Sequence, residues 1–327
     1  MTLAFVGSNP AIPATKNPVV AMPTGLYCSL AIAAIRHLEL VKLGISMLGI
    51  FELGSHEEIK EIVYTLALYD EFSLYAVVAA SKWTGGNDLI FRIAKHVDSW
   101  GKIHAVERLE SESGEIRDWI LRHGCENGVM DAYLGLTCAI KGDLISALRE
   151  DHIDGELFEG CATIIDALLD EGPVPGISEY EHAHEALLLH IRNMGEYASN
   201  LKHLWHTLNI MQWADSSDES YSDEVAGLCS EIIDRPEWRE TIVSALERRD
   251  DADFFYACNA ADRMGLDVGS YVLDAIRADP IKHHAYTRQP LNYNRAQLNG
   301  HTREEYSLRS IVGLGRKAWQ AAKGHIA

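Results

Sequence analysis

The sequence lacks the short motifs by which many enzyme families are recognised. It contains no G-x-S-x-G, P-loop or G-x-G-x-x-G fingerprint, and His184-Glu185 is not followed by the second histidine of the zincin motif HExxH. Six cysteines are present, but none belongs to a CxxC pair. We therefore expect no catalytic residue, metal or cofactor. We interpret the cysteines as small buried thiols, with a disulfide or a zinc site as the alternatives.

Long uninterrupted apolar runs are also missing. The longest apolar stretch, residues 30–51, contains Arg36, Glu39 and Lys42, and these charges argue against a membrane span. No basic region opens the chain, so the proline-containing residues 1–27 are expected to form an extended arm and not a signal peptide. We expect a cytoplasmic protein that does not bind membranes.

Positive charge is scarce, with 29 Lys and Arg against 48 Asp and Glu and a net charge of −19. Binding to the phosphates of duplex DNA or RNA depends on clustered Lys and Arg, so we expect no duplex nucleic acid partner. The charge is also uneven. Residues 281–327 contribute +6, from eight basic residues and two glutamates, which leaves −25 for the first 280 residues.

A short pattern recurs between residues 58 and 144 at a spacing of 27 to 30 residues. Each copy opens with an acidic residue followed by an apolar one: Glu58-Ile59, Asp88-Leu89, Glu115-Ile116 and Asp143-Leu144. A second element lies between these pairs: Leu74-Tyr75-Ala76-Val77, Ile103-His104-Ala105-Val106 and Met130-Asp131-Ala132-Tyr133. Each copy therefore contains two segments.

Both segments of each copy are predicted to be helices. Ile59, Ile62, Val63 and Leu66 follow the i, i+3, i+4 spacing that places apolar side chains on one helix face. The acidic residue stands at the predicted helix start, where the helix dipole favours negative charge. One helical hairpin cannot bury its apolar face alone, so successive hairpins must stack. The predicted fold class is all-α, with a solenoid arrangement.

The pattern resembles HEAT-type repeats in the short form common in bacteria, because Ala76, Ala105 and Ala132 occupy equivalent small positions in units of about 30 residues. The resemblance implies a right-handed α-α superhelix of stacked HEAT-like hairpins. It transfers no catalytic residue, because the family as a whole has none; its members include scaffolds, bilin lyases and DNA glycosylases. The glycosylases hold a duplex in a basic groove, and this acidic chain departs from that requirement. Armadillo and tetratricopeptide arrays are the alternatives, and the 34-residue tetratricopeptide period fits poorly.

Two breaks divide the rest of the chain. Residues 172–176 read Gly-Pro-Val-Pro-Gly, and the acidic run 215–224 is interpreted as a solvated linker, with a cation-binding loop as the alternative. Gly195 is expected to split the amphipathic stretch between these breaks into two helices. The predicted order is an extended arm (1–27), HEAT-like repeats (28–171), a long helix pair (177–214), further HEAT-like repeats (222–280), and a basic polar loop with a capping helix (281–327).

The last segment has three interpretations. It is a polar loop followed by a helix that caps the array, or it folds back on the acidic body or reaches a second subunit to form a homodimer, or it holds an anion. The candidate ligand-binding residues of this segment are His283, His284, Arg288, Tyr293 and Arg295.

A second group of candidates lies on the long helix pair. His203 and His206 share one helix face and Trp213 follows on the same helix, which suits a ligand-binding groove. The alternative is a half-buried polar face. Tyr75, His104 and Asp131 occupy equivalent positions in successive copies, where they form either a hydrogen-bonded relay or a structural polar ladder.

Two classes of function remain. The first is a non-enzymatic scaffold whose acidic curved surface binds a basic protein or peptide. The second is a small-ligand carrier or enzyme that uses the inner groove near His203, His206 and the C-terminal loop. We expect the scaffold, because no catalytic constellation is present.

Overall fold

The computed structural model of the protein describes residues 38–53, 56–172, 174–249 and 251–279. Within these ranges the chain forms fifteen α-helices and no strand, which confirms the predicted all-α class. A π-helix, η2 (Ile120–Gly124), and a 3-10 helix, η3 (Ile177–Glu179), join them. The α-helices are α2 (Leu38–Leu48), α3 (Glu57–Ala67), α4 (Asp70–Ala80), α5 (Gly86–Ala94), α6 (Ser99–Arg108), α7 (Gly114–Trp119), α8 (Ala132–Lys141), α9 (Leu144–Leu148), α10 (Gly155–Leu169), α11 (Ala183–Tyr197), α12 (Leu201–Ser216), α13 (Ser222–Ile233), α14 (Glu237–Arg248), α15 (Asp251–Arg263) and α16 (Gly269–Ala278).

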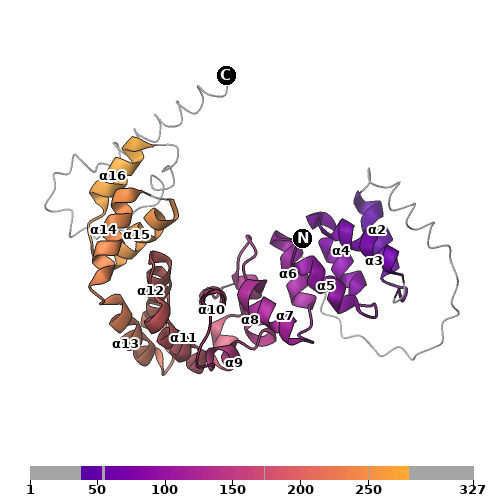
Figure 1. Cartoon of the computed structure of the whole chain (residues 1–327), viewed down its shortest axis with the longest axis horizontal. Helices are drawn as coiled ribbons and strands as arrows, with labels where there is room; N and C mark the ends of the chain where they lie inside the picture. The colour runs from indigo at the N-terminus through magenta and orange to yellow at the C-terminus, as the bar shows by residue number, and fades with distance from the viewer. Residues whose placement is uncertain (1–37, 54–55, 173, 250, 280–327) are drawn as a thin grey trace, which may run out of the picture.

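Alternate helices stack into two rows. Helices α2, α4, α6, α8, α10 and α12 each pack against the next member of this set, which we call the inner row. On the other side α3 packs against α5, and α9, α11 and α13 pack in succession, forming the outer row. Figure 1 shows both rows following one arc, with α4 to α12 of the inner row on its concave side. This arrangement is compatible with the predicted stack of helical hairpins.

The repeating unit lengthens along the chain. Near the start, Nζ of Lys42 donates to Glu71, 29 residues later, across neighbouring members of the inner row. In the second half, Nζ of Lys202 donates to Glu159 across α12 and α10, and these partners are 43 residues apart. The period of 27 to 30 residues therefore describes only the first units.

The predicted starts of the outer helices agree with the structure. Glu58, Asp88 and Glu115 lie in the first turns of α3, α5 and α7, and Asp143 is the residue that precedes α9. The unpaired backbone N–H groups of these first turns carry partial positive charge, so a carboxylate there is favourable.

The predicted register of α8 is wrong. Ala76 and Ala105 are buried and each lies six residues after the first residue of its helix, α4 or α6. Ala132 is also buried but is itself the first residue of α8. The loop of residues 125–131, which follows η2, delays the start of α8 and shifts the equivalence.

The predicted division of the long amphipathic stretch also needs correction. Gly195 lies inside α11, and the break between α11 and α12 falls at residues 198–200. There the side chain of Asn200 accepts a hydrogen bond from the backbone N–H of His203 and caps the start of α12. Side-chain capping, and not glycine, sets the boundary.

Five cysteines, Cys125, Cys138, Cys161, Cys229 and Cys258, are free and buried, as predicted. Burial raises the pKa of Cys161, Cys229 and Cys258 to about 12. None of the described helices has the length and apolarity needed to cross a bilayer. Cys28, the predicted arm (1–27) and the predicted basic loop and capping helix (281–327) lie outside the described residues.

Candidate functional site

Two inner-row helices, α10 and α12, run parallel. At their N-terminal halves, Lys202 and His203 of α12 contact Glu159 of α10. One to two turns further along both helices, Asn209 contacts Asp166. Because the contacts advance in the same direction on both helices, the C-terminal ends of α10 and α12 lie side by side.

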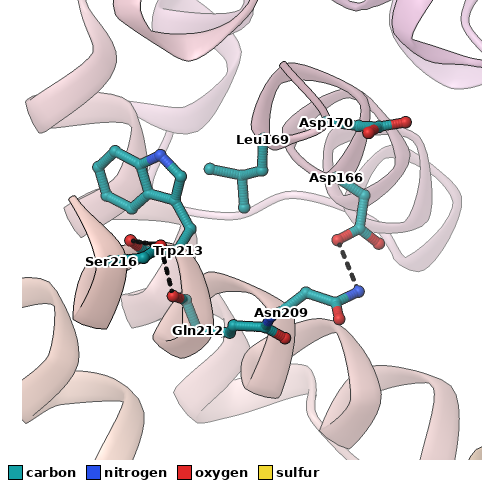
Figure 2. Close-up of a pocket in the computed structure, with 7 residues that line it drawn as sticks. All are labelled: Asp166, Leu169, Asp170, Asn209, Gln212, Trp213 and Ser216. Carbon is teal, nitrogen blue, oxygen red and sulfur yellow. Dashed lines mark hydrogen bonds between the residues drawn. The ribbon is translucent and has the colours of Figure 1, made fainter. Parts of the chain in front are cut away.

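A pocket of about 520 Å³ opens between these C-terminal ends. In Figure 2 residues of α10 face residues of α12 across the space, with the indole of Trp213 forming one wall. The side chain of Asn209 donates a hydrogen bond of 3.4 Å to Oδ1 of Asp166, so these two residues bridge the helices at one edge. The lining consists of Asp166, Leu169, Asp170, Asn209, Gln212, Trp213 and Ser216.

The electrostatics of this pocket favour a cation. Its lining contains two carboxylates, Asp166 and Asp170, and no Lys or Arg. The C-terminal end of an α-helix carries about half a negative charge, and here two such ends adjoin one space. Neither α10 nor α12 has a basic residue in its last turn to offset this charge. The helix ends and the carboxylates therefore both favour a cation in the pocket.

Three buried histidines of α11 and α12 lie in the core next to α10. Nδ1 of His206 lies 2.7 Å from Oδ1 of Asp166, and Nε2 of His206 lies 2.7 Å from Nε2 of His190 on α11. His203 is hydrogen-bonded through Nε2 to Glu159 and accepts a hydrogen bond at Nδ1 from the backbone N–H of residue 199. Both ring nitrogens of His203 therefore have hydrogen-bond partners, whereas Nδ1 of His206 lies close to Asp166 without a hydrogen bond.

Phe158 of α10 holds the histidines together. Its ring stacks on His190 at 5.8 Å and on Tyr197 at 5.1 Å, and it meets the edge of His203 at 5.1 Å. Phe158 is 1% exposed and His190 is fully buried. The cluster therefore forms part of the seam that joins α10, α11 and α12.

Within the histidine cluster, His190 at the centre is neutral and the charged group is Glu159 at the edge. Burial, reinforced by the neighbouring His206 and His203, lowers the pKa of His190 well below its usual value, so this ring is neutral. Burial tends to raise the pKa of Glu159, but hydrogen bonds from Lys202 and His203 outweigh it and lower the pKa. Nδ1 of His190 is buried and makes no hydrogen bond within the described part of the chain.

Within the described ranges no group of three or more His, Cys, Asp or Glu residues is placed to hold a metal ion. Cys161 is buried on α10, and its raised pKa keeps it a thiol at neutral pH, so it is a poor nucleophile.

The structure separates the residues that the sequence singled out. Trp213 lines the pocket, whereas His203 and His206 lie in the core beside it, 5% and 2% exposed. The remaining candidates, His283, His284, Arg288, Tyr293 and Arg295, lie outside the described residues.

Sequence reasoning missed most of the pocket. Asn209, Gln212, Trp213 and Ser216 follow the i, i+3, i+4, i+7 spacing of one helix face, and this was a detectable signal. The partners on α10 and the third histidine, His190, gave no local signal, because their contacts join residues 16 to 43 positions apart.

The proposed relay of Tyr75, His104 and Asp131 is not formed. Nδ1 of His104 lies 3.8 Å from Glu107 on its own helix, and Asp131 accepts a hydrogen bond from the backbone of Asn127. Among the residues that the structure describes, no hydrogen bond or ion pair joins the three side chains. The register shift at α8 accounts for this, since it displaces Asp131 from the equivalent helical position.

Comparison of the chain with protein-family models, with curated proteins and with solved structures gave no match. The resemblance to HEAT-type repeats therefore stays a prediction, and the function has to be argued from the site.

Proposed function

We propose that the protein is a non-enzymatic scaffold that holds a basic protein or peptide on its acidic, curved inner row. One observation carries the proposal: the pocket between α10 and α12 combines two carboxylates with two negative helix ends and contains no basic side chain. A cationic partner supplies the charge that this surface lacks.

The charge of the whole body supports the same partner. The first 280 residues carry −25, so a basic partner is attracted over a distance of about one Debye length, roughly 8 Å at physiological salt. Such complementarity raises the association rate and selects against acidic partners.

Exposed apolar side chains on the inner row add contact area. Three successive members of the row, α4, α6 and α8, each carry a large apolar residue at least 40% exposed, namely Val78, Trp100 and Ile140. Trp100 also packs on Tyr133 of the next inner helix, with ring centroids 5.4 Å apart. Aromatic and apolar residues of this kind are enriched in protein interfaces.

The second candidate function is a small-ligand carrier. It is favoured by the pocket volume of about 520 Å³, which lies in the range of small-molecule sites, and by the indole wall of Trp213. The buried histidines then act as structural neighbours of the ligand and not as its partners.

Native mass spectrometry of untagged protein from its own host tests both candidates. The scaffold predicts complexes whose added mass is that of a polypeptide, and these complexes dissociate as the salt concentration rises because surface charges are screened. An added mass of a few hundred daltons that survives high salt supports the carrier. Bare chains that also fail to bind lysine-rich peptides at low ionic strength would contradict the scaffold.

The homodimer proposal needs its own test. The basic segment 281–327 and the acidic remainder are complementary in charge, so two copies attract one another. Sedimentation of the full chain is expected to show a dimer at low salt, and deletion of residues 281–327 is expected to leave a monomer. A monomeric full chain at low salt removes the proposal.

A further inference from the structure

We propose that the pocket between α10 and α12 recognises one arginine side chain of the basic partner. The inference rests on the proposed scaffold function and specifies which group of the partner occupies which place on the inner row. It is carried by the acceptors, the aromatic wall and the field of the pocket taken together.

The acceptors are available for a new donor. Oδ1 of Asp166 is engaged by His206 and Asn209, while Oδ2 makes no hydrogen bond to any other described residue. The carboxylate of Asp170 is exposed and makes no ion pair or hydrogen bond in the described ranges. Arginine has five N–H donors and no acceptor, so it matches a site whose charged groups are all acceptors.

Asp166 is oriented by α12 before any partner binds. Asn209 donates a hydrogen bond to Oδ1, and the ring of His206, which is 2% exposed and hydrogen-bonded to His190, lies 2.7 Å from the same oxygen. A carboxylate that is already oriented loses little side-chain entropy when a guanidinium arrives.

The aromatic wall suits a planar cation. Trp213 is half-buried and lines the pocket, and its ring lies 6.0 Å from Tyr221 at an angle of 31°. Tyr221 in turn stacks on His184 at 4.5 Å and 13°, so the aromatic surface continues beyond the pocket. A guanidinium can lie flat on an indole face while its edge donates to carboxylates.

Other ligands fit less well. A lysine ammonium is a compact and strongly hydrated charge that does not combine flat stacking with paired hydrogen bonds. A divalent cation lacks a suitable set of ligands in the described ranges. A neutral sugar could stack on Trp213 but would gain nothing from the negative helix ends of α10 and α12.

The probes are two short peptides of alternating glycine and lysine that differ at the central position, which is arginine in one and lysine in the other. Both have the same net charge, so general attraction to the acidic body cancels in the ratio of their affinities. We expect the wild-type protein to bind the arginine peptide about fivefold more tightly, as measured by fluorescence anisotropy at low ionic strength.

The decisive variant is Asp170→Asn, because Asp170 is exposed and does not touch the histidine cluster. Its matched control is Asp234→Asn, which removes the same charge from an exposed aspartate directly after an outer-row helix, α13. Asp170→Asn is expected to reduce the arginine preference to about twofold or less. Asp234→Asn is expected to keep the preference. Trp213→Leu, with its melting temperature checked, is expected to lose the preference as well.

Each other outcome overturns the pocket assignment. Equal wild-type affinity for both peptides leaves the scaffold intact and refutes the arginine pocket. An arginine preference that survives Asp170→Asn, or that both aspartate variants reduce alike, places recognition elsewhere on the surface. Failure of both peptides to bind refutes the scaffold together with the pocket. Tight binding of a neutral sugar that Trp213→Leu abolishes assigns the pocket to a carbohydrate.

Discussion

His190 and His206 face each other through their Nε2 atoms at a distance of 2.7 Å. Only one of the two nitrogens can donate at a time, so one proton lies in the hydrogen bond between the rings. Nδ1 of His206 also lies 2.7 Å from Oδ1 of Asp166 but makes no hydrogen bond there. Burial holds His190 in its neutral state.

Stability is expected to fall as the pH drops below about 6.5, because His190 resists protonation in the folded protein. Burial lowers its folded pKa well below the unfolded value of about 6.5, so the unfolded chain binds the extra proton. The contribution is fully present above pH 6.5 and is lost progressively below it. Between pH 7.5 and pH 5.5 the free energy of unfolding measured in urea is therefore expected to decrease.

His190→Gln isolates this contribution, since the amide of glutamine can still form a hydrogen bond with His206 but does not titrate. Between pH 7.5 and pH 5.5 the free energy of unfolding is expected to fall less in this variant than in the wild type. His152→Gln is the control, because His152 is exposed, and it should follow the wild-type curve. Equal slopes for wild type and His190→Gln would show that His190 is protonated in the folded state.

Gly160→Ala is expected to destabilise the protein by about 1 to 3 kcal/mol. A Cβ atom at Gly160 would lie 2.2 Å from the carbonyl oxygen of Leu121 and 2.7 Å from Cα of Arg122, so α10 could not stay against η2. Gly227→Ala is the matched control, because it lies within α13 with no atom near its Cβ position. There alanine should stabilise by about 0.5 to 1 kcal/mol. Thermal unfolding of both variants gives the comparison, and equal shifts would contradict the close approach.

Asn127→Ala is expected to cost about 3 kcal/mol of stability. The side chain is fully buried, donates to the carbonyls of Cys125 and Met130, and accepts from the backbone N–H groups of Val129 and Met130. Its removal leaves several buried backbone groups without partners. Asn259→Ala removes a single side-chain bond to the preceding turn of α15 and should change the urea midpoint little. A mild effect of Asn127→Ala would mean that water replaces the side chain.

Three cysteines are expected to resist alkylation in the folded protein. Burial encloses Cys161, Cys229 and Cys258 and raises the pKa of each to about 12, so the reactive thiolate is almost absent at pH 8. Treatment with iodoacetamide followed by peptide mass mapping should find them unmodified in native buffer and modified in urea. Modification in native buffer would indicate local opening of α10, α13 or α15.

The sequence predicted the helix boundaries that depend on residues close together in the chain. Helix starts at Glu58, Asp88 and Glu115 were found because the acidic and apolar signals lie within one turn of the boundary. The start of α8 was missed because the preceding loop is held by Asn127, whose hydrogen bonds give no periodic signal. Gly195 was chosen as a break because glycine often ends helices, whereas the capping side chain five residues later decided the boundary.

The candidate site shows the same difference between local signals and contacts formed only on folding. Trp213 was singled out from its own helix, and the structure places it in the lining. Asp166 and His190 were missed because their roles exist only once α10, α11 and α12 are packed together. The spacing of about 30 residues in the first units also predicts the wrong contact pairs for the later units. There Lys202 contacts Glu159, which lies 43 residues earlier in the chain.

Each inner helix stacks on the next member of its row, so unfolding is expected to be cooperative mainly between neighbouring units. A perturbation at one seam is transmitted first to the two adjoining units and weakens with each unit beyond them. Hydrogen exchange should then reveal a gradient of protection along the chain and not a single global value. A tightly bound partner that spans several units would join these local transitions into one, so the sharpness of melting would itself report occupancy of the inner row.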